Sequence, residues 1–313
     1  MYGELKLFSG RAHPSLSAEI ASYLDLPLGK LRLLNFADGE IFCQIEENVR
    51  GADIFLIQPC CPPVNENLME LLIVLDALKR SSAFRVTAVL PYYGYARQDK
   101  KDAPRVPITA KLVADLISAA GADRILTMDL HASQIQGFFD VPVDHLFAAP
   151  VLLEAIRELD IPNLTLVSPD AGGVERARAI AKRLHAGLAI LDKRRVAANK
   201  ADVMHVIGDV KGRSALILDD IIDTGGTMSK AIAALQEKGA QRVFAAGIHA
   251  VLSDPAIDRL MESPLETLLV TNTTPLDEKL ARCEKLKPFS VASLLGEAIK
   301  RIHDNSSVSS LFV

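Results

Sequence analysis

The sequence has no tryptophan, four cysteines and no long apolar run. The cysteines, at positions 43, 60, 61 and 283, lack the Cys-x-x-Cys spacing of zinc and redox sites, and an adjacent pair is a poor disulfide candidate. We therefore expect reduced thiols. The first residues, Met-Tyr-Gly-Glu-Leu-Lys, lack a signal-peptide core, and no apolar stretch approaches membrane-spanning length. The sequence thus predicts a cytoplasmic protein with no membrane partner.

An excess of positive charge is also absent. The chain contains 35 Lys and Arg against 39 Asp and Glu, which gives a formal net charge of −4. Nucleic-acid-binding proteins usually carry a basic patch, so no nucleic acid partner is expected, and any anion site must be local. A chain of 313 residues, of which 49% are hydrophobic, is long enough for about two domains with cores of their own.

Short apolar strands alternate with helical patterns along the whole chain, which is typical of an α/β fold with parallel sheets. Strands are predicted at residues 5–8, 31–36, 53–58, 85–90, 124–127, 165–167, 189–191, 215–218, 242–248 and 267–270. Helices are predicted at residues 67–79, 109–120, 150–158, 174–184 and 291–302. We expect two doubly wound parallel-sheet domains, residues 1–147 and 148–313.

The clearest functional signal follows the strand at 215–218. The next residues read Asp219-Asp-Ile-Ile-Asp-Thr-Gly-Gly-Thr227, and a helical pattern then runs to Gly239. Two glycines let the backbone approach an anion at a helix start, and no Lys follows them as it would in a triphosphate P-loop. Three acids beside a phosphate seat suit a sugar diol or its magnesium, so the pattern predicts a phosphorylated sugar. A plain turn with Asp223 capping the helix accounts for one acid only.

Two polar stretches in the first half follow predicted strands. Residues 91–107 have no apolar period over roughly 17 positions, which is long for a connection in a compact domain. Their basic side chains suit a polyphosphate clamp and a solvated surface loop equally well. Asp129-Leu-His131 comes after the strand at 124–127. A lone His is more often structural than a ligand, because magnesium prefers oxygen.

Three further stretches allow a structural and a functional interpretation. Ser168-Pro-Asp-Ala-Gly-Gly173 repeats the order of strand, acid, glycines and helix, which slightly favours a second anion or metal site over a plain turn. Lys193-Arg-Arg195 is typical of a solvated face, or of a cationic clamp if it lies beside a phosphate. Phe36-Ala-Asp-Gly-Glu40 is interpreted from its chemistry as a hairpin turn.

Together these stretches resemble the ribose-phosphate diphosphokinases, or phosphoribosyl-pyrophosphate synthetases, of the phosphate-activated class. The glycine loop alone also resembles that of the phosphoribosyltransferases, which share the type I phosphoribosyltransferase fold. The similarity covers nearly the whole chain, and the runs at 129–139 and 219–227 are its most specific parts. It implies two domains of that fold, with the C-terminal segment returning to the N-terminal domain. It also implies that ATP and ribose 5-phosphate give 5-phosphoribosyl 1-diphosphate and AMP.

The resemblance assigns site residues at the matching positions. It implies catalytic roles for Lys193 and Arg195 on a flexible loop, and adenine contacts from a neighbouring subunit in place of the hairpin turn at 36–40. ATP would bind to Phe36, Asp38, Gly39, Glu40, Arg97, Gln98, Asp99 and His131. Magnesium would be held by His131 and Asp170. Ribose 5-phosphate would bind to Arg195, Asp219, Asp220, Asp223, Thr224, Gly225, Gly226 and Thr227.

Regulation and assembly are likewise implied by the resemblance. Inorganic phosphate would activate and ADP would inhibit at an inter-subunit pocket formed by Arg50, Gln136, Ser307, Ser309 and Phe312, and the chain would form a homohexamer. Ser310 stands where relatives often have an aromatic or ring-bearing residue. The segment Asp102-Ala-Pro-Arg105 is also not a position-by-position match.

Two other functions compete with this one. A phosphoribosyltransferase would use the same glycine loop to consume the product, but it leaves residues 91–107 and the cations at 193–195 without a role. A non-catalytic regulatory homologue would be expected to have degraded catalytic positions, whereas His131, Asp170, Lys193 and Arg195 are all present.

Overall fold

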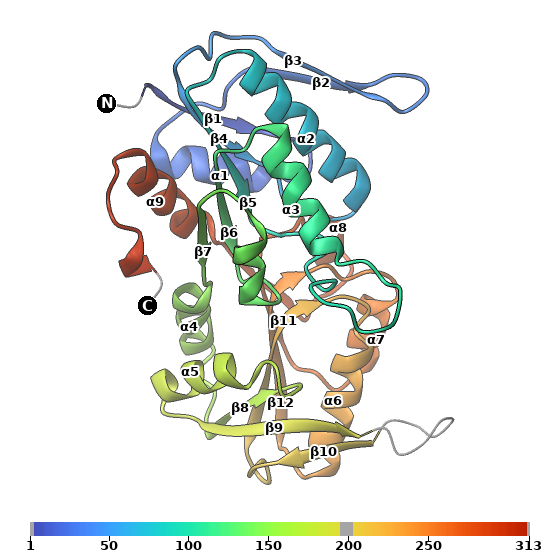
Figure 1. Cartoon of the computed structure of the whole chain (residues 1–313). Coiled ribbons are helices and arrows are strands. Elements are labelled where there is room, and N and C mark those ends of the chain that lie inside the picture. Colours follow the sequence, from blue (N-terminus) through green and yellow to red (C-terminus); the bar gives the residue numbers. More distant parts are fainter. Residues whose placement is uncertain (1–2, 195–202, 312–313) are drawn as a thin grey trace. The chain divides into compact units, whose positions relative to one another are not determined.

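The computed structural model describes residues 3–194 and 203–311 (Figure 1). The chain divides into two compact units. The first unit contains Met1–Ala148, Thr273–Pro275 and Ser290–Val313, and the second contains Ala149–Asn272 and Leu276–Phe289. The last segment of the chain therefore belongs to the same unit as the first.

The first unit is built on a five-stranded parallel sheet with the order β1-β4-β5-β6-β7. Its strands are β1 (Leu5–Ser9), β4 (Asp53–Ile57), β5 (Arg85–Leu90), β6 (Arg124–Met128) and β7 (Val143–Leu146). All five residues of β4 are buried. Side chains alternate along a strand, so Ile54 and Leu56 join the core cluster shared with Leu71 and Val113, while Phe55 and Ile57 point to the opposite face. Both faces of the sheet are thus covered, as a parallel sheet requires.

Helices cover the two faces of this sheet (Figure 1). On one side lie α2 (Val64–Arg80) and α3 (Thr109–Ala120), and on the other lie α1 (Pro14–Leu24) and α9 (Ala292–His303). The contact between α1 and α9 is close, since a Cβ on Gly296 would lie 2.4 Å from the Tyr23 ring. Two short 3-10 helices, η1 (Ser133–Phe138) and η2 (Ser309–Leu311), complete the helical elements described in this unit.

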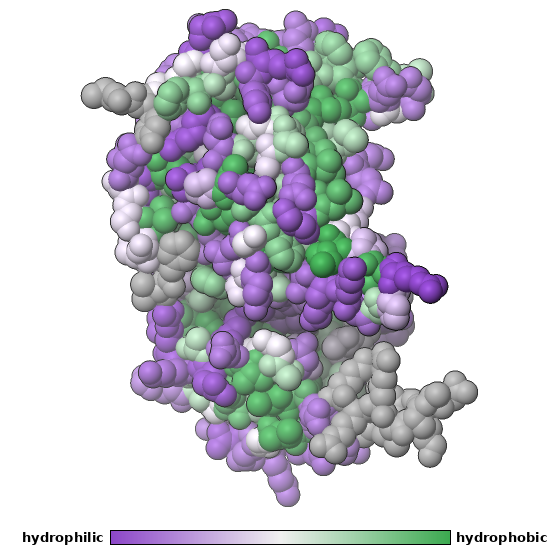
Figure 2. All heavy atoms as spheres, viewed as in Figure 1, coloured by the Kyte–Doolittle hydropathy of each residue, from purple (hydrophilic) through white to green (hydrophobic). Residues whose placement is uncertain are grey.

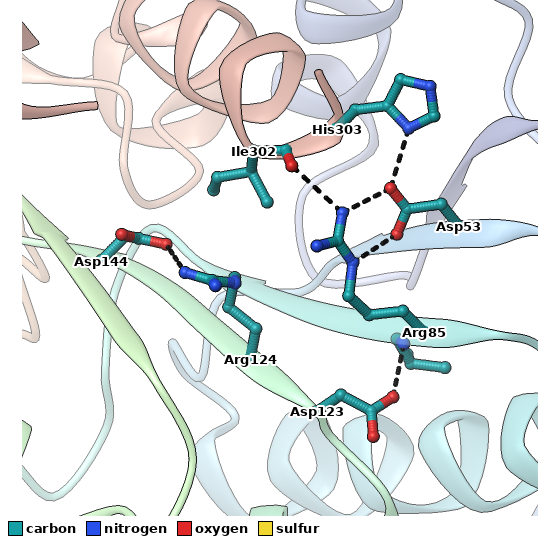
Figure 3. A network of polar contacts seen from close by, with 8 residues as sticks. Asp53, Arg85, Asp123, Arg124, Asp144, Ile302 and His303 are labelled. Atoms are coloured by element: carbon teal, nitrogen blue, oxygen red, sulfur yellow. Dashed lines mark hydrogen bonds and ion pairs between the residues drawn. The ribbon is translucent and has the colours of Figure 1, made fainter. Parts of the chain in front are cut away.

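A buried ion network ties α9 to the amino ends of β4 and β5 (Figure 3). The fully buried Asp53 carboxylate accepts two bonds from Arg85, at 2.7 and 2.6 Å, and lies 2.8 Å from His303 Nδ1. Arg85 also donates to the Ile302 carbonyl, at 3.2 Å. One carboxylate thereby joins a central strand, its neighbour and the last long helix of the chain.

The second unit has a seven-stranded sheet with the order β10-β9-β8-β11-β12-β13-β14. The strands are β8 (Leu164–Ser168), β9 (Gly187–Arg194), β10 (Val203–Ile207), β11 (Ser214–Ile222), β12 (Arg242–Ala250), β13 (Leu268–Thr271) and β14 (Leu286–Phe289). All neighbours are parallel except β9 and β10. The helices are α4 (Ala149–Glu158), α5 (Val174–Leu184), α6 (Gly226–Glu237), α7 (Ala256–Glu262) and α8 (Asp277–Leu280).

The predicted α/β fold class is confirmed. The structure corrects one boundary that matters for function, because β11 continues to Ile222 rather than ending at Leu218. Its pairing with β8 stops at Ile217, but β12 accompanies it to the end. Asp219 and Asp220 are therefore strand residues. None of the helices in the described part of the chain combines the length and apolar character that a membrane crossing requires.

Candidate active site

The strand order of the second unit reverses direction between β8 and β11. From β8 the chain proceeds outward through β9 and β10, and from β11 it proceeds in the opposite direction through β12, β13 and β14. Open α/β sheets bind ligands at such a reversal, beyond the carboxyl ends of the strands. The two acid-and-glycine loops, 168–173 and 223–227, follow the ends of these two strands.

Two other carboxylates act on Asp219 at the carboxyl ends of β8 and β11. Burial raises the pKa of Asp219 to about 7, and the negative charges of Asp220 and then Asp170 act in the same direction. The Asp220 amide donates to Asp219 Oδ1, at 2.9 Å, and Arg176 of α5 lies 4.0 Å from Asp220. Because Asp170 affects Asp219, the loop after β8 neighbours the end of β11. Carboxylate oxygens are the ligands that magnesium prefers, so the Asp170 side chain has the chemistry of the implied metal ligand.

The glycine loop has the geometry that brings backbone close to an anion. Gly225 is buried and left-handed, with φ of 72°, and its carbonyl accepts from the Ser229 amide and hydroxyl, at 2.9 and 3.0 Å. A Cβ on Gly225 would lie 3.3 Å from the Ala256 backbone. Thr224 and Thr227 are exposed. The amides at the start of α6 can therefore receive a phosphate, with hydroxyls beside them.

Sequence reasoning missed one residue beside this loop. Arg259 of α7 donates from Nη1 to the Thr224 carbonyl, at 2.9 Å. It lies 35 positions away along the chain, and no motif surrounds it, so nothing in the sequence linked it to the loop.

Asp170 lies in a defined turn before α5. Its Oδ1 accepts from the Gly173 amide, at 2.9 Å, and the Ser168 hydroxyl donates to the Asp170 carbonyl, at 2.7 Å. The Asp170 side chain is exposed. The structural interpretation, a turn with Asp170 near a helix start, thus describes the local geometry. Its role as a metal ligand stays a prediction.

In the first unit, residues 91–107 combine a buried anchor with a polar tip. Tyr93 is 2% exposed, packs edge-on against Phe139 with centroids 5.6 Å apart, and donates to the Ala110 carbonyl, at 2.8 Å. The sequence pattern did not predict this buried anchor, because Tyr92 and Tyr93 are adjacent and so produce no helical or strand period. Beyond them, a cavity of about 300 Å³ is lined by Arg97, Gln98, Lys100, Asp102, Val106 and Pro107. The segment is therefore not a plain solvated loop.

Residues 36–40 form the turn of a hairpin between β2 (Leu31–Asn35) and β3 (Ile41–Ile45). The Phe36 amide donates to the Glu40 carbonyl, at 2.8 Å, and Gly39 has φ of 95°. All five residues of the turn are exposed, and Phe36 is 51% exposed. The hairpin turn expected from chemistry is confirmed. An exposed turn can still offer these side chains to a nucleotide, and adenine contact stays a prediction.

His131 is exposed at the segment that follows β6. Its neighbour Asp129 is buried, adopts φ of 39°, and accepts from the Ala148 amide, at 2.6 Å. Asp129 is thus structural. His131 and Asp170 belong to different units. Within residues 3–194 and 203–311, no three His, Cys, Asp or Glu side chains gather into a metal-binding group.

The structure only partly describes the implied regulatory and catalytic residues. Arg301 donates to the Ser307 carbonyl, at 3.2 Å, and also to the Ser310 hydroxyl. Ser310 therefore has a local function in holding the tail on α9. In the described residues, no hydrogen bond or ion pair joins Arg50 or Gln136 to Ser307 or Ser309. Arg195 and Phe312 lie outside the described residues, and Lys193 is described as a backbone position of β9.

Comparisons with known proteins agree along the whole chain. Residues 5–121 match the family described as the N-terminal domain of ribose phosphate pyrophosphokinase, and residues 193–313 match the phosphoribosyl synthetase-associated domain. The chain is 55% identical to the ribose-phosphate pyrophosphokinase of Nostoc sp. over 98% of its own length and 93% of the relative. The Helicobacter pylori protein of that name is 56% identical over 98% and 96%. The crystal structure of phosphoribosylpyrophosphate synthetase from Mycobacterium smegmatis superimposes with a TM-score of 0.91 at 47% identity, covering 97% of this chain and all of the other.

Proposed function

Because the chain belongs to the ribose-phosphate pyrophosphokinase family, we propose that it transfers the diphosphoryl group of ATP to the 1-hydroxyl of ribose 5-phosphate. The products are 5-phosphoribosyl 1-diphosphate and AMP, which serve nucleotide biosynthesis. The observation that carries this proposal is the strand-order reversal between β8 and β11, where three acids precede a glycine loop. That arrangement suits a ligand with hydroxyls at one end and a phosphate at the other.

The second unit supplies the proposed sugar site. The loop amides and the hydroxyls of Thr224 and Thr227 receive the 5-phosphate, with Gly225 and Gly226 giving close access. Asp219, Asp220 and Asp223 accept hydrogen bonds from the ribose hydroxyls. The anomeric oxygen of the bound sugar then attacks the β-phosphorus of ATP, and AMP is the leaving group. Such a reaction asks the protein for positioning and neutralisation of charge rather than a covalent nucleophile.

The first unit supplies the proposed nucleotide residues. Arg97, Gln98 and Asp99 lie at or beside the 300 Å³ cavity and would bind ATP. Phe36, Asp38, Gly39 and Glu40 would contact adenine from a neighbouring subunit. We assign magnesium to His131 and Asp170, which would hold the ion, and when bound it would supply charge neutralisation for the transferred group. Lys193 and Arg195 would neutralise charge that develops during transfer.

Assembly and regulation extend this proposal. We infer residues 1–147 as the ATP and assembly domain and 148–313 as the sugar domain, with the C-terminal segment returning to the former. A homohexamer, activation by inorganic phosphate and inhibition by ADP through Arg50, Gln136, Ser307, Ser309 and Phe312 rest on the family alone. The expectation of a cytoplasmic enzyme rests on the sequence alone.

An AMP-release assay tests the function. The purified chain is incubated with magnesium, ATP and ribose 5-phosphate, with and without added inorganic phosphate, and the nucleotides are separated by chromatography. We expect AMP and 5-phosphoribosyl 1-diphosphate in equal amounts. Formation of ADP would mean that only the terminal phosphoryl group moves, which contradicts the proposal. Consumption of 5-phosphoribosyl 1-diphosphate with a nucleobase would favour a phosphoribosyltransferase, and no turnover would favour a regulatory homologue.

A further inference from the structure

One cation borders the glycine loop without belonging to either acid-and-glycine motif. The Nη1 atom of Arg259 donates to the Thr224 carbonyl, at 2.9 Å, and a Cβ on Gly226 would lie 3.5 Å from the same nitrogen. The guanidinium therefore lies beside the loop, next to the residues before and after Gly225. All of these residues belong to the second unit.

The loop itself carries no positive charge. Residues 219–227 contain three acids and no Lys or Arg, whereas a phosphate monoester carries a charge of about −1.5 to −2 at neutral pH. Backbone amides donate hydrogen bonds but do not neutralise that charge. A ligand phosphate at this loop would thus experience three nearby carboxylates unless a cation approached it.

Arg259 is available to be that cation. Its side chain is exposed, and among the residues that the structure describes the Thr224 carbonyl is its hydrogen-bond partner and no carboxylate pairs with it. By contrast, the nearby Arg282 pairs with Asp254 and Asp258, at 3.4 and 3.7 Å. A guanidinium has five N–H donors, so one bond to Thr224 leaves most of them for a ligand.

The helix that carries Arg259 is fixed against the loop. Lys285 Nζ donates to the carbonyls of Leu260, Met261 and Ser263 at the end of α7, at 3.0, 2.8 and 2.7 Å. At the start of α7, the Ala256 backbone packs against Gly225. The helix is thus held at both ends, which reduces the conformational entropy lost when Arg259 binds a ligand.

We propose that Arg259 binds the 5-phosphate of ribose 5-phosphate, donating from its remaining N–H groups while Nη1 keeps the Thr224 carbonyl. This assignment rests on the proposed function, which supplies the ligand. Arg259 is a substrate-binding residue here, and the charge-assisted bonds it makes complete a seat that the loop amides begin.

Calorimetric titration of ribose 5-phosphate into the full-length protein, with magnesium present and no ATP, tests the assignment. Arg259→Ala should weaken binding about tenfold to a hundredfold, the scale of a hydrogen bond to a charged group. Arg259→Lys keeps the charge and should stay within about fivefold of the wild type. Arg259→Gln can still donate to the Thr224 carbonyl but lacks charge, so it should bind as weakly as the Ala variant. Arg183→Ala, which removes an exposed cation from the last turn of α5, is the matched control and should bind normally.

The Lys and Gln variants decide between a phosphate contact and a structural bond. If Arg259→Gln binds ribose 5-phosphate as tightly as the wild type and Arg259→Lys does not, Arg259 only supports the loop, and the proposal is overturned. Normal binding by Arg259→Ala, or no binding of ribose 5-phosphate by the wild type, also overturns it. AMP release is measured separately. A wild type that binds the sugar phosphate through Arg259 but releases no AMP would reject the proposed function and leave this assignment standing.

Discussion

Asp219 shows how a single side chain couples folding stability to the chemistry of its site. Its pKa is raised to about 7 in the folded chain, first by burial and then by Asp220, while an unfolded chain would ionise it near 3.8. The folded chain holds the Asp219 proton more tightly than the unfolded chain does. This difference contributes to the free energy of unfolding in full below pH 3.8, and the contribution is lost as the pH rises toward 7. At neutral pH the folded protein holds a carboxylate that a bound cation would stabilise.

Replacement of this carboxylate by a neutral amide should remove that loss. Asp219→Asn is expected to raise the free energy of unfolding above the wild-type value, by an amount that grows between pH 4 and 7 and then levels off, on the order of a few kcal/mol. Urea denaturation without magnesium at pH 5 and pH 8 measures the difference. An equal effect at both pH values would show that the Asp219 pKa is not raised in the folded protein.

A side chain at Gly225 would meet two obstacles, the left-handed backbone and the crowding by Ala256. Gly212 has only the first, so comparing the two glycines separates the two costs. Gly225 has φ of 72° and would place a Cβ 3.3 Å from the Ala256 backbone, whereas Gly212 has φ of 69° and open space within 4 Å. Gly212→Ala should cost about 1–2 kcal/mol through the left-handed backbone alone. Gly225→Ala should cost at least about 1 kcal/mol more through crowding. Urea denaturation of both variants measures this, and equal losses would mean that Ala256 gives way.

Individual residues were predictable where chemistry and spacing agree. The acids and glycines of 219–227 stand in one continuous run, so the sequence alone indicated a phosphate site. Arg259 was not predictable, because its role depends on how α7 packs against a loop that is distant in sequence. The adjacent pair Tyr92 and Tyr93 was interpreted as part of a polar break, yet both are buried anchors.

At the scale of elements, the ion network at Asp53 anchors α9. Removal of one member of a buried pair leaves the other charge unpaired, so Asp53→Ala should lower the free energy of unfolding by about 3–5 kcal/mol. The control is Asp76→Ala on α2, whose partner Arg80 is 77% exposed, and which should change stability by less than about 0.5 kcal/mol. Chemical denaturation checks both, and a small effect of Asp53→Ala would mean that α9 is held by apolar packing alone.

Periodicity predicted several elements to the residue and missed others, including the 11-residue helix α1 and the strands β3 and β10. The helices α3 and α5 and the strand β5 have the predicted bounds. The four-residue strands β7 and β14 were missed, since so few residues cannot show alternation. The strands β9 and β11 extend past their apolar runs, because pairing with a neighbouring strand continues where the apolar pattern ends.

For the whole molecule, the surface of the first unit offers a place for self-association. Figure 2 shows apolar side chains over α2 and α3, where Met69, Leu112 and Leu116 are 52%, 54% and 41% exposed. If copies of the chain meet on this face, Leu112→Glu should lower the mass of the assembly measured by light scattering, because the interface would have to bury an unpaired charge. Lys182→Glu, a charge change on the exposed side of α5, should leave the mass unchanged. Retention of the wild-type mass by Leu112→Glu would place the contact elsewhere.

The return of α9 to the first unit has a consequence for how the chain is made. Synthesis runs from the N-terminus, so the strands β1 to β7 and the helix α1 leave the ribosome long before α9, which covers the same face of the sheet as α1. The second unit contains none of the last 24 residues, Ser290–Val313, and can complete its core earlier. The unit whose synthesis begins first is thus the unit that is completed last, and one face of its sheet lacks α9 until the end of translation.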